Sequence, residues 1–309
     1  MMGEILYEEE PIEEPVQLDP DEDEEKKIYS LFERDFLKKP GEHLLGIGIT
    51  GSGKTQKSYW FAKQLLPHET LVWFDCGKSS NFGRSAEIGP LFTFGVPVNI
   101  IIPMGVDIQV VGSPVPVTIL KTPRPADVWD LCEAGKINIV AINRFFLDPD
   151  LYAKYTAEVF RQLIILSQNA KDRLRRLLPM AIFHDEFQDV SPGVTMALSP
   201  SHLYSAKIVA WNINKLRSIG VRVCAFTQKY TFIYPNTRAA FSWILCCRGA
   251  YFEREDPDLA AFNRLYKHLD VFQAILWFPK RLFKHRWRFR LYQGPPGLVI
   301  SHEGVLTNV

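Results

Sequence analysis

The chain has 309 residues and a formal net charge of +1, and hydrophobic residues make up 47% of it. This length allows one large α/β core with a small addition, and it is short for two full α/β domains. No stretch reaches the roughly 18 to 20 uncharged apolar residues of a membrane span. The acidic N-terminus also has the wrong sign for a signal peptide, so neither a membrane-spanning nor a secreted protein is expected.

The net charge hides an uneven distribution along the chain. Residues 1–25 contain twelve Asp or Glu and no Lys or Arg, whereas the rest of the chain carries a net charge of +13. Carboxylate repulsion and the prolines Pro11, Pro15 and Pro20 predict a disordered acidic tail. The tail is either a solvated arm without a role, a mobile arm that occupies the basic body, or a handle for a basic protein partner.

Residues 48–55 fit the phosphate-loop pattern G-x-x-x-x-G-K-[ST]. An apolar run at 43–49 predicts a buried strand before the loop, and helical spacing over 56–66 predicts a helix after it. Glycines let backbone N–H groups close around a phosphate chain at the positive end of that helix. We therefore expect an ATP site in which Lys54 reaches the β and γ phosphates and Thr55 offers its hydroxyl to Mg²⁺. The residues predicted to bind the nucleotide are Gly48, Thr50, Gly51, Ser52, Gly53, Lys54 and Thr55.

Strands and helices alternate along the chain after this loop, which predicts a mostly parallel sheet with both faces covered, an α/β fold. Apolar runs predict strands at 71–75 and 137–142, and a long amphipathic helix is expected over 151–176. A short helix is expected over 124–133. The Val, Ile, Pro and Gly content of 96–117 predicts a β-rich insertion, such as a hairpin.

Two further polar sites follow predicted strands. The apolar run that begins at 178 ends in the adjacent acids Asp185 and Glu186, a Walker B arrangement. Asp185 would hold Mg²⁺ through water, and Glu186 would orient the water that attacks the γ-phosphate. Gln228 follows the predicted strand 219–226, at the strand end where ligands bind in open α/β sheets. It is expected to hydrogen-bond the γ-phosphate and the attacking water.

Together these segments resemble the FtsK–HerA superfamily of RecA-like, DNA-pumping ATPases. The matching segments are Thr50–Thr55, Phe74–Asp75, Asp185–Glu186 and the stretch Lys215–Gly220 that runs into Thr227–Gln228. The resemblance covers about residues 41–250. It implies a hexameric ring or similar homo-oligomer with a channel for double-stranded DNA, and the small size looks most like the compact genome-packaging type.

The resemblance also implies an arginine that completes the site of the neighbouring subunit. Arg217 matches that position, and Arg238 and Arg248 are rivals for it. The domain organisation predicted in this way is an acidic tail at 1–25, an ATPase core at 26–250 and a C-terminal basic and aromatic extension at 251–309.

Within the C-terminal extension, residues 280–290 contain six basic residues and no acid, interleaved with aromatic ones. As a strand, Arg286, Arg288 and Arg290 would face one side, and Trp287 and Phe289 the other. Such a strand either contacts DNA phosphates or is an edge strand kept soluble by its charges.

Two other functions compete with a DNA pump. Asp185–Asp189 also resembles the D-E-x-Q-D motif of superfamily 1 helicases, although the stretch from Gln228 to Val309 is short for a second motor domain. The second competing function is a nucleotide-gated switch that moves no DNA. The five cysteines, which include no C-x-x-C pair, indicate a reducing cytoplasm, that of the host if the protein is viral.

Overall fold

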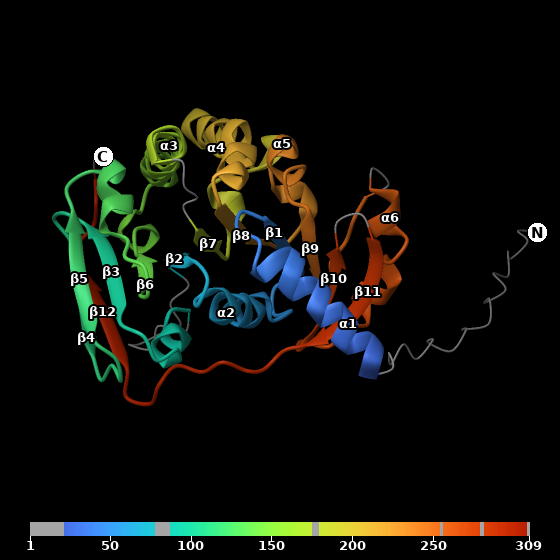
Figure 1. Ribbon diagram of the computed structural model, residues 1–309. Coiled ribbons are helices and arrows are strands. Elements are labelled where there is room, and N and C mark those ends of the chain that lie inside the picture. Colours follow the sequence, from blue (N-terminus) through green and yellow to red (C-terminus); the bar gives the residue numbers. More distant parts are fainter. Residues whose placement is uncertain (1–21, 78–86, 175–178, 254–255, 279–280, 308–309) are drawn as a thin grey trace, which may run out of the picture.

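A computed structural model describes residues 22–77, 87–174, 179–253, 256–278 and 281–307. Its largest feature is a sheet of ten strands in the order β11-β10-β9-β1-β8-β7-β2-β6-β3-β5. Every neighbouring pair from β9 to β5 is parallel, and β10 and β11 add to the β9 edge in antiparallel fashion. The predicted α/β fold with a mostly parallel sheet is confirmed (Figure 1).

The strands predicted at 43–49, 71–75, 137–142 and 219–226 and the helices predicted at 56–66 and 151–176 each lie within a few residues of an observed element. The short helix expected over 124–133 is a 3₁₀ helix, Pro125–Leu131. The strands are β1 Leu44–Ile47, β2 Thr70–Phe74, β3 Val98–Pro103, β4 Asp107–Val111, β5 Val117–Thr122, β6 Ile137–Val140, β7 Met180–His184, β8 Val221–Thr227, β9 Trp243–Cys247, β10 Gln273–Phe278, β11 Arg281–Arg288 and β12 Val299–Glu303. The α-helices are α1 Glu22–Phe32, α2 Lys54–Leu65, α3 Pro149–Leu174, α4 Pro200–Ser218, α5 Pro235–Arg238, α6 Pro257–Ala260 and α7 Asn263–Lys267.

Helices cover both faces of the sheet, α3 and α4 one face and α1 and α2 the other (Figure 1). The alternation of side chains along β8 explains how one strand serves both layers. Val223 and Ala225 join the cluster beneath α3 and α4, whereas Cys224 and Phe226 join the cluster beneath α1 and α2. A central strand buried on both faces is therefore mostly apolar, and in β8 only Arg222 and Thr227 depart from this pattern.

The ends of α4 are set by local chemistry. The Ser199 hydroxyl accepts a hydrogen bond from the His202 N–H, and Pro200 occupies the first helical turn. Gly220 follows the helix with a φ of 88°, a backbone conformation that glycine adopts without strain. These signals place β8, and the polar residues at its end, directly after the helix.

Three sequence expectations differ from the structure. Residues 96–117 are rich in β-strand, as expected, but the suggested hairpin is wrong, because β3 and β5 pair in parallel and β4 leaves the main sheet to pair with β12. The helix α1 begins at Glu22, inside the range expected to be disordered, because residues 22–32 supply an apolar stripe that packs Ile28 and Phe32 into the core. The rest of the tail, residues 1–21, lies outside the described residues.

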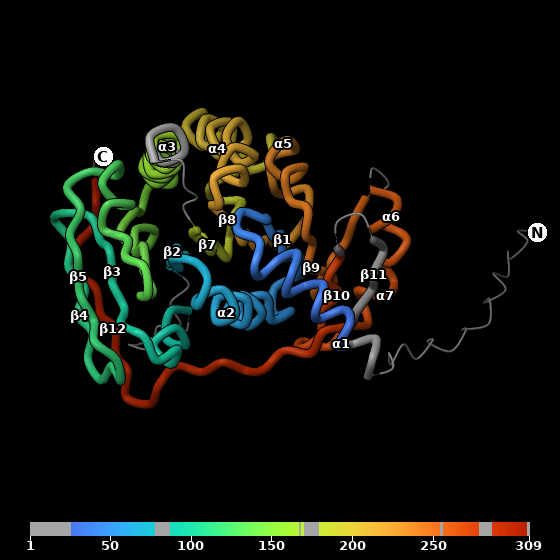
Figure 2. Tube along the Cα trace, viewed as in Figure 1, coloured from blue at the N-terminus to red at the C-terminus, as the bar shows by residue number. Residues whose placement is uncertain are grey.

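The third difference concerns the C-terminal residues, which lie against the rest of the chain. β10 and β11 continue the main sheet, and the following segment runs past α2 to β12 at the other end of the molecule (Figure 2). The Gln56 side chain on α2 holds this segment at Tyr292: its Nε2 donates to the Tyr292 carbonyl at 3.1 Å and its Oε1 accepts the Tyr292 N–H at 2.5 Å. The boundary predicted at residue 250 thus falls within a continuous sheet, between β9 and β10.

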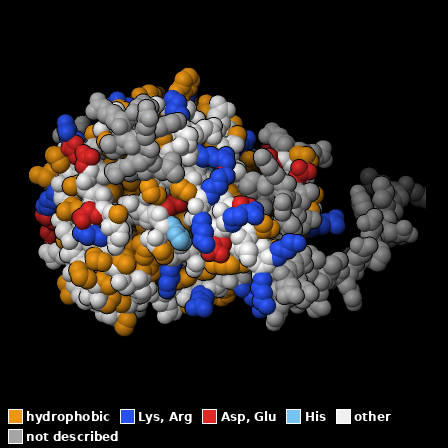
Figure 3. All heavy atoms as spheres, viewed as in Figure 1, with side chains coloured by type: hydrophobic (Ala, Val, Ile, Leu, Met, Phe, Trp, Pro, Cys, Tyr) orange, Lys and Arg blue, Asp and Glu red, His pale blue; other side chains and the backbone are white. Residues whose placement is uncertain are grey.

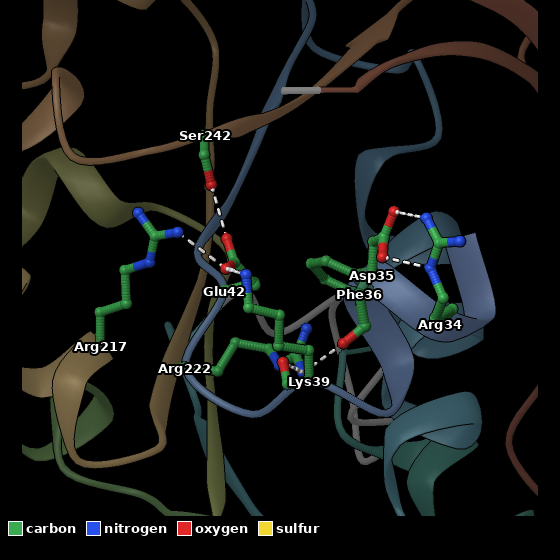
Figure 4. A network of polar contacts seen from close by, with 8 residues as sticks. All are labelled: Arg34, Asp35, Phe36, Lys39, Glu42, Arg217, Arg222 and Ser242. Carbon is green, nitrogen blue, oxygen red and sulfur yellow. Dashed lines mark hydrogen bonds and ion pairs between the residues drawn. The ribbon is translucent and has the colours of Figure 1, made fainter. Parts of the chain in front are cut away.

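A buried ion pair ties the segment after α1 to the sheet. Arg222 on β8 and Glu69 before β2 are almost fully buried, and Arg222 Nη2 lies 2.5 Å from Glu69 Oε1. The same nitrogen donates to the carbonyls of Phe36 and Lys39 at 2.7 and 3.0 Å (Figure 4). Loss of either partner would leave a buried charge without its counterion, which typically costs about 3 to 5 kcal/mol.

His43, just before β1, is buried in its neutral form. Its Nδ1 accepts the Val223 N–H at 3.0 Å, and its Nε2 donates to the Ile213 carbonyl at 2.9 Å. Burial lowers the pKa of His43 to about 4, from an ordinary value of 6.5. Between these two pH values the unfolded chain binds a proton at His43 that the folded chain does not bind.

We therefore expect the free energy of unfolding to fall as the pH drops below about 6.5, with His43 contributing about 1.4 kcal/mol per pH unit down to about pH 4. Urea unfolding at several pH values in this range measures the slope. His43→Gln keeps one donor and one acceptor but does not titrate, so its slope should be smaller by close to one proton. Equal slopes in the two proteins would contradict this assignment.

Candidate functional site

The predicted phosphate loop lies between β1 and α2, at the carboxyl edge of the sheet. Gly51 and Gly53 have φ values of 75° and 76°, which residues with a side chain rarely adopt. At Gly48, an added Cβ would lie 2.7 Å from both Ser52 Oγ and Cys247 Cβ. The three glycines are thus required by backbone conformation or by close packing.

Lys54 begins α2 and folds back over the loop. Its Nζ donates to the carbonyl of Gly48 at 2.9 Å and to that of Ile49 at 3.2 Å. The ammonium group therefore lies across the same loop whose backbone N–H groups would meet a phosphate chain. The role of Lys54 toward the β and γ phosphates stays a prediction.

The two halves of the predicted ATPase site meet at Thr55 and Asp185. Thr55 Oγ1 donates a hydrogen bond of 2.5 Å to Asp185 Oδ2, which joins residues 130 positions apart. Asp185 is buried directly after β7. A hydroxyl and a carboxylate oxygen are hard donors of the kind that Mg²⁺ prefers, so this pair fits that cation.

Glu186 follows Asp185 and is partly buried. Its carboxylate accepts a hydrogen bond from the Gln188 side-chain amide in the short 3₁₀ helix 187–189. Gln188 thus lies in a helical turn and holds the Glu186 carboxylate in this structure.

Gln228 lies between the two halves of the site. It follows β8, whose neighbours in the sheet are β1 and β7. Ile47 pairs with Thr227, and the Gly48 N–H donates to the Thr227 carbonyl at 3.3 Å. Because the three strands are parallel, their carboxyl ends bring the phosphate loop, Gln228 and the two acids to one edge.

The strand end Phe74–Asp75, which contributed to the family resemblance, is held by structural contacts. The buried Asp75 carboxylate accepts a hydrogen bond of 2.5 Å from Arg144 Nε. Nearby, His184 on β7 lies with Nδ1 3.6 Å from Cys76 Sγ and Nε2 3.3 Å from the Tyr152 hydroxyl. These buried polar contacts fix the ends of β2 and β7 beside Asp185.

The three candidate arginines occupy different places. Arg217, at the end of α4, lies at the opposite edge of the sheet and forms an ion pair of 2.7 Å with the buried Glu42 carboxylate (Figure 4). Arg248 follows β9 and lies next to the phosphate loop of its own chain, with Nη2 3.4 Å from the Gly51 carbonyl. Arg238 packs over the Tyr230 ring. The arrangement gives Arg217 a structural partner and leaves its role toward a neighbouring subunit a prediction.

The basic strand predicted near the C-terminus is β11, at the outer edge of the sheet. Trp287 and Phe289 are buried, whereas Arg286, Arg288 and Arg290 are exposed, so the predicted separation of a cationic and an apolar face is confirmed for these residues. Lys280 lies outside the described residues. Exposed arginines on an edge strand fit both DNA contact and protection of the edge.

A second group of basic side chains lies on the surface. Figure 3 shows Lys and Arg side chains gathered over the middle of one face, with few acids among them. Lys38 and Arg34 belong to the segment before β1, and both are exposed and paired with neighbouring acids, Glu33 and Asp35. The charge of these two residues is therefore already neutralised within the chain.

Two features near the phosphate loop were not expected from the sequence. Lys57 on α2 points behind the loop and donates to the Val271 carbonyl at 2.6 Å. The Gln56 contact with Tyr292 likewise joins α2 to the C-terminal segment. Nothing local in residues 271 or 292 signals these contacts, because they depend on how the C-terminal segment returns across the fold.

No helix of the described residues is long and apolar enough to span a bilayer. The sequence matches no family model, and no curated protein matches it either. Many solved structures do match in fold.

Among the solved structures is the genome packaging NTPase B204 of Sulfolobus turreted icosahedral virus 2 in complex with ATP-gammaS, with 12% identity, a TM-score of 0.47 and coverage of 82% of this chain and 99% of that one. The pCW3 conjugation coupling protein TcpA has 14% identity, a TM-score of 0.41 and coverage of 84% and 62%. ATPases 2 and 3 of EccC from Thermomonospora curvata have 11% identity, a TM-score of 0.43 and coverage of 84% and 40%.

The structural neighbours thus include a genome-packaging NTPase and a conjugation coupling protein. At this low identity the likeness is one of fold, and the candidate site is defined by the residues and geometry of this chain. That geometry is a phosphate loop, a facing pair of acids and an intervening polar strand end at one edge of a parallel sheet.

Proposed function

We propose that the protein is an ATPase that uses ATP and Mg²⁺ to move double-stranded DNA as a homo-oligomeric ring, a compact member of the FtsK–HerA superfamily. The observation that supports this most directly is the hydrogen bond of 2.5 Å between Thr55 and Asp185, which joins the phosphate loop to the acidic strand end. The position of β8 between β1 and β7 adds Gln228 to the same edge.

Each residue has a distinct task in this proposal. Backbone N–H groups of the loop and the Lys54 ammonium bind the phosphates, and Thr55 and Asp185 hold Mg²⁺. When bound, the cation neutralises charge that develops on the phosphate oxygens. Glu186, held by Gln188, accepts a hydrogen bond from the attacking water and orients it. Gln228 contacts both that water and the γ-phosphate.

The charged groups on the surface suggest which partners the protein binds. Duplex DNA would be bound without regard to sequence through phosphate contacts, for which the exposed arginines of β11 are candidates. The acidic tail would compete with DNA for basic surface or bind a basic partner. The five cysteines form no disulfide among the described residues. The proposed location is a reducing cytoplasm, that of the host for a viral protein.

Two substitutions should separate nucleotide binding from hydrolysis. Lys54→Ala removes the charge that meets the phosphates, so ATP binding should weaken. Glu186→Gln keeps the side-chain shape but removes the carboxylate that orients water, so ATP should still bind while turnover falls by about 100-fold or more. ATP titration and steady-state phosphate release measure the two effects. Normal turnover in Glu186→Gln would remove this residue from the catalytic role.

The kind of DNA that the protein acts on is tested by measuring the ATPase rate without DNA, with single-stranded DNA and with long duplex DNA. The oligomeric state of the same sample is measured alongside. Stimulation by duplex is the expected result, and it should weaken as salt rises because phosphate contacts release counterions. A preference for single strands would favour the helicase. A rate indifferent to DNA would favour a nucleotide-gated switch and would contradict the pump.

The arginine in trans is tested by mixing subunits. Arg217→Ala keeps its own phosphate loop, so mixtures with Lys54→Ala should regain activity where one intact loop meets one intact Arg217. Glu42→Gln is the matched control, because it breaks the same ion pair and leaves Arg217 in place. An equal loss of activity in Arg217→Ala and Glu42→Gln would make the role of Arg217 structural. Recovery only with Arg238→Ala or Arg248→Ala would assign the role to one of those residues.

A further inference from the structure

A second lysine in the first turn of α2, Lys57, lies behind the phosphate loop. Its side chain is fully buried. The Nζ donates to the carbonyls of Ser52 at 2.8 Å, Gly53 at 3.4 Å and Val271 at 2.6 Å. The ring of Phe289 lies beneath it, with the centroid 5.6 Å from Nζ. Lys57 thus joins two consecutive carbonyls of the loop to the C-terminal segment.

This placement is unfavourable for the fold taken alone. Burial of an ammonium group costs several kcal/mol in typical proteins, and burial lowers the pKa of Lys57. The first turn of a helix also repels cations, yet α2 begins with Lys54 and Lys57 and has no acid in that turn. No carboxylate of the described residues forms an ion pair with Lys57. A charge in this position is best balanced by an anion bound at the loop.

The contacts of Lys57 also set the direction of the loop amides. In a trans peptide the C=O and the following N–H point in opposite directions, and the described chain has no cis peptide. The Ser52 and Gly53 carbonyl oxygens both point back to Lys57 Nζ. The Gly53 carbonyl also accepts the Lys57 backbone N–H at 3.2 Å, as the first hydrogen bond of the helix, so the side chain alone sets only the direction of the Ser52 carbonyl. The N–H groups of Gly53 and Lys54 therefore point away from Lys57, toward the side of the loop that would receive phosphate.

Val271, the partner of Lys57 in the C-terminal segment, also packs closely against the phosphate loop. An added Cβ at Gly53 would lie 2.6 Å from the Val271 carbonyl oxygen, so the segment before β10 packs directly on the loop. Lys57 bonds to that same carbonyl, 214 positions further along the chain. The loop is consequently held between α2 and a segment that is distant in sequence.

We propose that Lys57 is a positioning residue for the nucleotide phosphates: its ammonium group turns the Gly53 amide toward them, supplies a second positive charge behind them, and fixes the loop to Val271. The inference rests on the proposed ATP-binding function. It assigns to the C-terminal segment a part in nucleotide binding, and it does not require Lys57 to touch the nucleotide.

The test is titration of the full chain with a non-hydrolysable ATP analogue, ADP and AMP. Lys57→Met removes the charge and the donors at similar length, and Lys57→Gln removes the charge but keeps two N–H donors. Lys63→Met is the control, since Lys63 lies exposed on the last turn of the same helix. We expect Lys57→Met to weaken binding of the ATP analogue and ADP by about 10- to 100-fold. AMP binding should change less, and Lys63→Met should match the wild type.

A merely structural role would lower the thermal stability and affect all three nucleotides alike. Binding of the ATP analogue within twofold of wild type by folded Lys57→Met would overturn the inference. A weaker effect in Lys57→Gln than in Lys57→Met would divide the contribution between donors and charge and support it. If neither variant folds, Lys57 is needed for the fold itself and the inference fails. Absence of nucleotide binding by the wild type would instead refute the proposed function.

Discussion

The parallel alignment of β1, β8 and β7 is the constraint on which the site depends. Register pairs Ile47 with Thr227 and His184 with Ala225, so the three strands end at nearly the same level. Parallel strands present their carboxyl ends, and the loops that follow them, at one edge. The phosphate loop, Gln228 and the two acids after β7 meet there, although each belongs to a different part of the chain.

The apolar layers on both faces hold this alignment. Side chains of β8 pack alternately into the cluster beneath α3 and α4 and into the one beneath α1 and α2. Arg222 is the exception on this strand, and Glu69 and two backbone carbonyls satisfy its charge. His43 bridges β8 and α4 in its neutral form. Polar groups inside the core therefore fix the neighbouring elements at the amino edge, opposite the candidate site.

The residues after β9 are an integral part of the fold and do not form a separate appended segment. β10 and β11 extend the sheet, Val271 contacts the phosphate loop through Lys57, and Tyr292 is held by Gln56 on α2. The segment ends in β12, which pairs with β4 beyond the opposite edge of the main sheet. The phosphate loop and Val271 are joined by the buried Lys57 ammonium group and by the close packing of Gly53 on the Val271 carbonyl.

The sequence by itself determined the local chemistry: the glycine turn before Lys54, the apolar strand that ends at Asp185, and the alternation of arginine and aromatic residues around Trp287. Each depends on near neighbours in the chain, where backbone preference and side-chain period decide the outcome. Only the tertiary structure decided that β3 and β5 are parallel, that Arg217 pairs with Glu42 and that Lys57 reaches Val271. These contacts join distant segments, and their partners are set by strand order and the path of the C-terminal segment, which no local pattern records.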